Sequence, residues 1–205
     1  MILTDKDIRA LCTNEKKSTA GMINPFFEES LQSESYDLAI GKRIAVLKKE
    51  VRCIDITDQN KIDSIYDEME LPASGYVLSP KEYVLVSVRE NIALPESITA
   101  HIRPRTRFTR LGLLVSDQHC NSTYEGNLKL GLFNATDYAI KIFPGVRIAQ
   151  IVFEELKSTP SSEKMYKNKV NAVYQNEQEF RGAVASKKLE DKVAEAVSLL
   201  LKRDN

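Results

Sequence analysis

The most unusual segment of this sequence is residues 102–115, Ile-Arg-Pro-Arg-Thr-Arg-Phe-Thr-Arg-Leu-Gly-Leu-Leu-Val, in which arginines are clustered between two apolar runs. The arginines are Arg103, Arg105, Arg107 and Arg110. If the segment is extended, the first three point to one face, because side chains alternate along a strand. Guanidinium groups arranged in this way are suited to bidentate binding of phosphate oxygens. The alternative is a solvated edge whose arginines form salt bridges with acidic loops.

The cysteines and histidines do not have the spacing of a metal site. Cys12, Cys53 and Cys120 are widely separated, and the histidines are His101 and His119. A zinc-dependent nucleotide deaminase holds its metal with H-x-E and P-C-x-x-C strings, and neither string occurs in the sequence. We therefore expect no zinc and no metal ligands supplied by the protein.

The composition is that of an ordinary soluble domain. The 205 residues include 29 basic and 29 acidic ones, so the formal net charge is zero and no nucleic-acid partner is expected. Apolar residues make up 42% and charged residues 28%, both normal for a globular core. No apolar run has the length of a membrane helix, and the first residues lack the layout of a signal peptide. We expect a cytoplasmic protein with no membrane partner.

A short amphipathic helix is predicted near the N-terminus. Thr4 is a candidate N-cap with Asp7 three residues later, and Ile8, Leu11 and Cys12 follow at helical spacing.

Short apolar runs with β-branched residues dominate the middle of the chain. Examples are residues 83–88, 128–132, 140–142 and 146–153, separated by proline and glycine. Many short strands with turn signals between them predict a mainly β protein with a closed or double-sheet antiparallel fold.

Three further segments have a different character. Residues 55–71 are acidic and polar, and are predicted to be a surface loop or an insertion. Residues 157–183 are polar with mixed charge, which is typical of a tail that orders on a neighbour or a ligand. Residues 187–202 carry a helical apolar stripe, predicted to pack on the same domain or on a sister subunit.

Four motifs resemble the dCTP deaminase and dUTPase superfamily. Residues 105–113, Arg-Thr-Arg-Phe-Thr-Arg-Leu-Gly-Leu, are similar to its R-S-S-x-x-R-L-G-L motif. Residues 1–8 resemble the start of dCTP deaminases, residues 35–41 their S-Y-D-L-x-L-G segment, and residues 181–186 their Q-G-A-V-A-S tail. The motifs occur in the family's order and extend over almost the whole chain.

The resemblance implies a distorted jelly-roll, dUTPase-like β-barrel with a short N-terminal helix and a C-terminal helix. It further implies a homotrimer with three sites at subunit interfaces, each binding a pyrimidine deoxynucleoside triphosphate, dCTP or dUTP, with Mg²⁺. On this basis residues 1–183 form the dCTP deaminase/dUTPase-like domain, and residues 184–205 form a C-terminal helical extension.

The family's nucleotide-binding residues can be carried over by position. Arg105, Thr106 and Arg107 match the R-S-S string that holds the triphosphate. The tail that closes over the nucleotide contributes Tyr166, Lys169 and Glu177, with Gln178 as an alternative to Glu177.

The catalytic positions depart from the family. The glutamate that deaminases carry in G-x-I-x-L-E is Gly131 here, and the aspartate with which dUTPases activate water is Asn121. Thr106 and Arg110 remain as remnants of the catalytic machinery. Losing a general acid or base typically lowers the rate at least about 10²–10⁴-fold.

Three hypotheses follow. The first is a nucleotide-binding pseudoenzyme that senses or sequesters a pyrimidine deoxynucleotide. The second is an active deaminase or diphosphatase with a rebuilt site, in which Asp117, His119 or Glu125 supplies the base. The third is a structural trimer subunit that needs no ligand.

Overall fold

The structure is a computed structural model that describes residues 1–13, 21–51, 53–180, 182–187 and 191–192. It consists of two compact units. The first comprises Met1–Val46 and Glu68–Arg181, and the second comprises Leu47–Asp67 and Gly182–Asn205. The predicted apolar helix of residues 187–202 lies almost entirely outside the described residues.

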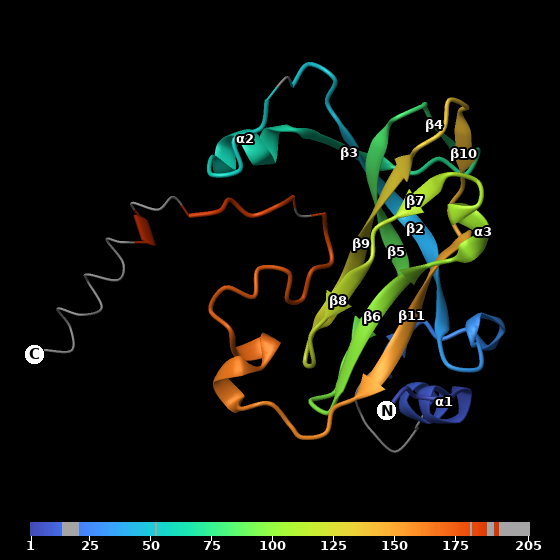
Figure 1. Cartoon of the computed structure of the whole chain (residues 1–205), viewed down its shortest axis with the longest axis vertical. Helices are drawn as coiled ribbons and strands as arrows, with labels where there is room; N and C mark the ends of the chain where they lie inside the picture. The colour runs from blue at the N-terminus through green and yellow to red at the C-terminus, as the bar shows by residue number, and fades with distance from the viewer. Residues whose placement is uncertain (14–20, 52, 181, 188–190, 193–205) are drawn as a thin grey trace, which may run out of the picture. The chain divides into compact units, whose positions relative to one another are not determined.

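The first unit is built on a curled antiparallel sheet (Figure 1). Its main path runs β7-β9-β5-β2-β11-β6-β8, with β1 paired to β5 and β3 paired to β2. The bounds of the strands in this sheet are β1 Ile23–Asn24, β2 Tyr36–Leu47, β3 Tyr66–Glu70, β5 Tyr83–Ala93, β6 Ile98–Pro104, β7 Leu113–Val115, β8 Gln118–Cys120, β9 Glu125–Asn134 and β11 Arg147–Glu155. A separate hairpin pairs β4, Tyr76–Leu78, with β10, Ile140–Ile142.

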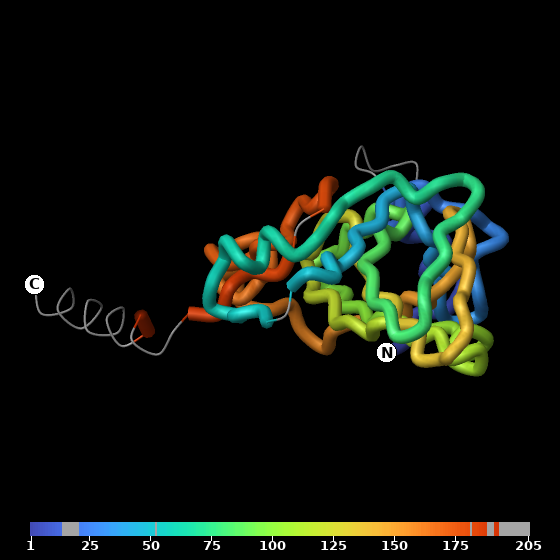
Figure 2. Tube along the Cα trace, turned by 90° about the horizontal axis from the view of Figure 1, so that it is seen from above, coloured from blue at the N-terminus to red at the C-terminus, as the bar shows by residue number. Residues whose placement is uncertain are grey.

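The curl of the sheet encloses the core. Strand β6 contacts β7 although β7 is the first strand of the path and β6 the sixth. Seen from above, the strands curve around a common centre (Figure 2). Alternate residues of each strand point inward, and those of β5 and β9 are fully buried, including Val84, Val86, Leu130 and Leu132. The predicted mainly β fold, a distorted dUTPase-like jelly roll, is confirmed.

The short helices cap the sheet. Helix α1, Asp5–Thr13, begins where predicted, because the Asp7 carboxylate accepts hydrogen bonds from the Thr4 backbone N–H (3.0 Å) and hydroxyl (2.8 Å). Ile8 on this helix is buried. Helix α3, Thr106–Thr109, follows β6 directly. One-turn 3-10 helices occur at η1 Glu28–Ser30, η2 Ser162–Lys164 and η3 Tyr166–Asn168.

Of the two predictions for residues 55–71, a surface loop or an insertion, the surface loop is wrong. This segment contains α2, Gln59–Ser64, and enters β3. The Asp58 side chain caps α2 by accepting from the Lys61 N–H, and Ile62 and Ile65 are buried. These two isoleucines supply the apolar contacts that the surrounding acidic composition concealed.

The end of the described chain is held within the same second unit. The Gln59 side chain donates to the Ala183 carbonyl (3.2 Å) and accepts from the Ala185 N–H (2.8 Å). The Ser186 N–H donates to the Ile56 carbonyl at 2.7 Å.

Candidate functional site

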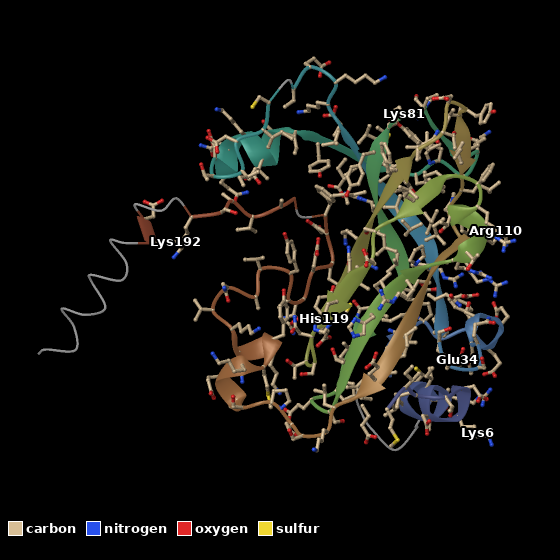
Figure 3. All side chains as sticks on the ribbon, viewed as in Figure 1. Lys6, Glu34, Lys81, Arg110, His119 and Lys192 are labelled. Atoms are coloured by element: carbon tan, nitrogen blue, oxygen red, sulfur yellow. The ribbon has the colours of Figure 1, made fainter. Side chains whose placement is uncertain are left out.

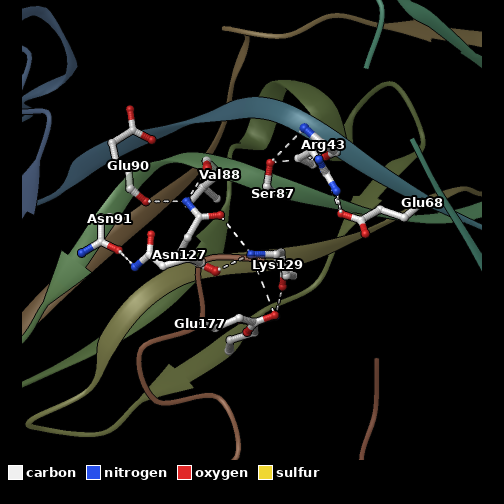
Figure 4. Close-up of polar contacts among 11 residues, drawn as sticks. Arg43, Glu68, Ser87, Val88, Glu90, Asn91, Asn127, Lys129 and Glu177 are labelled. Carbon is white, nitrogen blue, oxygen red and sulfur yellow. Dashed lines mark hydrogen bonds and ion pairs between the residues drawn. The ribbon is translucent and has the colours of Figure 1, made fainter. Parts of the chain in front are cut away.

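A polar row lies along one face of β9 (Figure 4). Asn127, Lys129 and Gly131 alternate with the core leucines of this strand, so all three face the same side. Strand β5 places Ser87 opposite Lys129 and Leu85 opposite Gly131. On the face opposite to the core, the pairing thus places a polar residue beside Lys129 and an apolar residue beside Gly131.

Lys129 is the central charge of this row. Only 8% of its side chain is exposed. Its Nζ donates to the Asn127 carbonyl at 2.9 Å and to Asn127 Oδ1 at 3.0 Å, and lies 3.8 Å from Glu177 Oε1. Burial lowers the pKa of Lys129, and the Glu177 carboxylate opposes this shift. The ammonium is thus a partly desolvated donor in a largely dry environment.

Glu177 comes from the C-terminal tail, which runs along the start of β9. The Asn127 N–H donates to the Glu177 carbonyl and the Asn176 N–H to the Glu125 carbonyl, both at 2.7 Å. The close approach requires glycine at Gly126, because a Cβ there would stand 3.0 Å from the Glu177 nitrogen. The side chain of Glu177 is 7% exposed. The tail is therefore ordered on its own chain.

The side chains of Glu177 and its neighbour Gln178 have different partners. The Glu177 carboxylate faces Lys129, whereas the Gln178 amide donates to Asn91 Oδ1 at 3.1 Å. Both residues contact unit-one strands, but Glu177 alone of the two brings a charge into the polar row.

Gly131 lies two residues beyond Lys129 on the same face of β9, and the Tyr83 side chain occupies the space beside it. A Cβ built on Gly131 would lie 2.3 Å from the hydroxyl oxygen of Tyr83. The Gly131 backbone is fixed by Ser116, whose Oγ accepts from the Gly131 N–H (2.9 Å) and whose N–H donates to the Gly131 carbonyl (2.8 Å). Burial raises the pKa of Tyr83, which therefore keeps its proton at neutral pH.

The arginine segment is not extended throughout, so the condition under which three arginines would share one strand face is not met. Arg103 lies in β6, but Thr106–Thr109 form α3, ended by Gly112 in the left-handed region (φ +76°). The arginines consequently have different partners. Arg103 lies 3.8 Å from Asp117, and the guanidinium of Arg107 lies over the Phe108 ring at 5.3 Å.

Arg105 pairs with a buried carboxylate from the S-Y-D-L motif. Its Nη1 lies 2.9 Å from Asp37 Oδ2, and Arg147 approaches the same oxygen at 3.8 Å. Asp37 is fully buried, and its Oδ1 has no hydrogen-bond partner among the described residues. Burial raises the pKa of Asp37, while the two arginines act to lower it. Arg105 therefore stabilises the fold in addition to any role with a ligand.

The remaining predicted site residues fall into two places. Thr106 is exposed at the start of α3, and Arg110, the residue after the helix, is exposed and points outward (Figure 3). In the tail, the Tyr166 ring packs against Tyr124 at 5.9 Å between centroids, and Lys169 Nζ lies 6.0 Å from the Tyr166 ring. Helix α3 and the tail lie on opposite sides of the sheet in Figure 1.

The candidates for a rebuilt site have other contacts. Asp117 is 75% exposed beside Arg103, and the His119 ring packs on His101 with centroids 4.9 Å apart. Glu125 is exposed, and its backbone is bound by the tail. The backbone carbonyl of Asn121 accepts a hydrogen bond from the Tyr124 N–H at 3.1 Å.

The described residues contain no group of three or more histidine, cysteine, aspartate or glutamate side chains placed to hold a metal ion. Within the same part of the chain, no helix is long and apolar enough to cross a membrane.

The curled sheet, the arginine-bearing turn and the tail on β9 define a protein of the dUTPase-like class. Residues 2–156 match the dCTP deaminase-like family, and the chain belongs to that family.

Individual relatives agree with this assignment. The dUMP-forming dCTP deaminase of Sulfurihydrogenibium sp. is 34% identical over 190 residues, which cover 91% of this chain and 97% of the relative. The dUMP-forming dCTP deaminase of Aquifex aeolicus is 32% identical over 170 residues, covering 82% and 88%. The crystal structure of 2'-deoxycytidine 5'-triphosphate deaminase from Agrobacterium tumefaciens superimposes with a TM-score of 0.58 at 26% identity, covering 75% of this chain and 48% of that one. The chain thus spans about half the length of that crystallised protein.

Proposed function

We propose that this protein binds a pyrimidine deoxynucleoside triphosphate, dCTP or dUTP, and that its catalysis is impaired or lost. The observation that carries the proposal is the pair Gly131 and Tyr83. The position of the family carboxylate has no side chain, and the Tyr83 phenol fills the adjoining space.

The loss of catalysis follows from proton transfer. Deamination needs a group that accepts and returns a proton as water attacks the ring, and a glycine cannot do this. The amide of Asn121 is neutral and not a general base. Thr106 and Arg110 can hold and orient water but do not exchange protons readily at neutral pH. We expect deamination and diphosphate hydrolysis to be very slow or undetectable.

Binding is assigned to a site shared between copies of the chain in a homotrimer. In one chain, Arg105, Thr106, Arg107 and Arg110 lie in or next to α3. The tail that carries Tyr166, Lys169 and Glu177 lies on the opposite side of the sheet (Figure 1). A neighbouring copy can bring the two sets together. Exposed leucines beside α3 are consistent with such an interface, namely Leu111 at 61% and Leu114 at 45% exposure.

The residues are suited to Mg²⁺ that arrives with its triphosphate. Mg²⁺ usually keeps several waters and binds through substrate phosphates and one or two carboxylates. The described residues offer no carboxylate cage, but Arg107 and Arg110 are exposed cations beside α3. The metal would neutralise phosphate charge, while the arginines would hold the remaining oxygens.

Thermal unfolding with dCTP, dUTP and ATP, each with and without Mg²⁺, tests the binding proposal. We expect the pyrimidine deoxynucleotides to raise the melting temperature and ATP to leave it unchanged, because a ligand that binds the folded state stabilises it. Light scattering on the same samples should give three times the mass of the chain. No shift with either pyrimidine nucleotide would favour the ligand-free structural trimer, and a monomer would contradict a shared site.

A further inference from the structure

The polar row on β9 contains a charge that the proposed function does not use. Lys129 stands two residues before Gly131 on the same face of the strand, so the two positions are roughly 6.6 Å apart along it. The position that holds a proton-accepting carboxylate in the family holds no side chain here. The nearest charge on the row is instead a cation.

The Lys129 ammonium makes two hydrogen bonds of normal length and one longer ion pair. Two of its three N–H groups donate to Asn127, at 2.9 and 3.0 Å. The third has Glu177 Oε1 at 3.8 Å, an ion-pair separation longer than a hydrogen bond. With 8% of the side chain exposed, solvent provides little compensation. A ligand acceptor that reaches this ammonium would therefore complete its hydrogen bonding.

We infer that Lys129 selects pyrimidine nucleotides that carry a carbonyl at C4, so that the site prefers uracil or thymine to cytosine. The inference rests on the proposed function, since it takes the base to lie against the row beside Gly131.

The chemistry of the two bases gives the direction of this preference. A lysine ammonium donates hydrogen bonds and accepts none. Uracil and thymine present a carbonyl oxygen at C4, which accepts from an ammonium. Cytosine presents an amino group at C4, which donates and would face another donor. The Tyr83 hydroxyl beside Gly131 keeps its proton and adds a second donor to the same face.

Two carboxylates, Glu177 and Glu68, act on Lys129. Glu68 is paired with Arg43 at 2.6 Å, so Glu177 defines the rival interpretation. Its carboxylate can accept from the amino group of cytosine, which would reverse the preference. Its backbone is fixed to β9 through Asn127, and its side chain faces Lys129. The inferred arrangement keeps this carboxylate as the counter-ion of Lys129 and leaves the third N–H for the base.

The test compares the affinities of the α,β-imido analogues of dUTP, dTTP and dCTP, which resist hydrolysis, in the presence of Mg²⁺ by calorimetry. The proteins are the wild type, Lys129→Met, Lys129→Gln, Glu177→Gln and the control Lys141→Met, whose lysine is exposed on β10. We expect the wild type and the control to bind the uracil and thymine forms about 10- to 100-fold more tightly than the cytosine form, the range of one charged hydrogen bond. Lys129→Met should bring this ratio close to one. Lys129→Gln keeps a neutral donor, so its affinity ratio should lie between those of the wild type and Lys129→Met. This variant provides a second test if the methionine variant unfolds.

Each other outcome has a defined meaning. A wild type that binds all analogues equally, or a ratio unchanged in both Lys129 variants, overturns the inference and leaves the proposed function standing. Equal loss of affinity for all three analogues in the variants would make Lys129 a phosphate ligand and also overturns it. A selective loss of the cytosine form in Glu177→Gln supports the rival. If the wild type binds none of them, the proposed function fails and the inference falls with it.

Discussion

The hydroxyl of Tyr83 on β5 lies 2.3 Å from the point at which a Cβ on Gly131 of β9 would stand. The two residues are diagonal neighbours across paired strands, since Leu85 is opposite Gly131 and Tyr83 is opposite Phe133. The phenol therefore occupies the space that a side chain at position 131 would need. Restoring a carboxylate to this strand requires the tyrosine to move.

Gly131→Glu should destabilise the protein without restoring deamination. Forcing a side chain into this packed position costs about 1–3 kcal/mol of unfolding free energy. The double variant Gly131→Glu/Tyr83→Ala should be more stable than the sum of the two single changes, because the smaller residue relieves the clash. Urea unfolding of the three variants measures this coupling. Strict additivity would show that Tyr83 does not limit position 131.

Arg105→Ala should lower stability even without nucleotide. It removes the cation 2.9 Å from the buried Asp37 carboxylate and leaves Arg147 at 3.8 Å. Breaking a buried ion pair in this way costs roughly 3 kcal/mol. Arg103→Ala is the matched control, because its pairing with the exposed Asp117 is worth less than about 1 kcal/mol. Equal stability of the two variants in urea unfolding would contradict a structural role for Arg105.

The titration of Asp37 should appear in the pH dependence of stability. Burial raises the pKa of this carboxyl above its ordinary value of 3.8. The folded state therefore favours the protonated form, and the resulting stabilisation is full below that ordinary value and lost as pH rises through the folded-state pKa. The difference in unfolding free energy between the wild type and Asp37→Asn should thus decrease as the pH rises from about 3.8 through the folded-state pKa. Urea titrations at several pH values test the sign, and a difference that grows with pH in this window would indicate a lowered pKa.

Glu177→Ala should loosen the tail from β9. The variant removes the carboxylate facing Lys129 and leaves a buried ammonium, at a cost on the order of 1–3 kcal/mol to the docked tail. Hydrogen exchange of the Asn127 and Asn176 amides, which form the backbone bonds between tail and strand, should accelerate. The exposed neighbour variant Glu179→Ala should leave both rates unchanged. Equal protection in the two variants would show that the backbone bonds alone hold the tail.

Local patterns were sufficient to predict β5, β9, β10, β11 and the first helix. The leucines within residues 128–132 predict β9, and the Thr4–Asp7 spacing predicts the helix start. These features depend on residues close together in the sequence, and the structure confirms them.

The contacts that define the site depend on distant segments and could not be predicted in this way. The burial of Lys129 requires the tail to bring Glu177 to the start of β9. The approach of Tyr83 to Gly131 depends on the register between β5 and β9. The pairing of Arg105 with Asp37 depends on contacts between distant segments, with Arg105 at the start of α3 and Asp37 on β2.

The most direct test of the central proposal is chromatographic analysis of nucleotides after prolonged incubation of the pure protein with dCTP and, separately, with dUTP and Mg²⁺. Thermal unfolding of the same samples must first show that the nucleotide is bound. The proposal predicts a raised melting temperature with no dUTP or dUMP formed from dCTP and no dUMP formed from dUTP beyond traces. Robust turnover of either nucleotide would contradict the loss of catalysis at Gly131 and Asn121, and would make Glu177, Asp117, His119 and Glu125 the first side chains to replace.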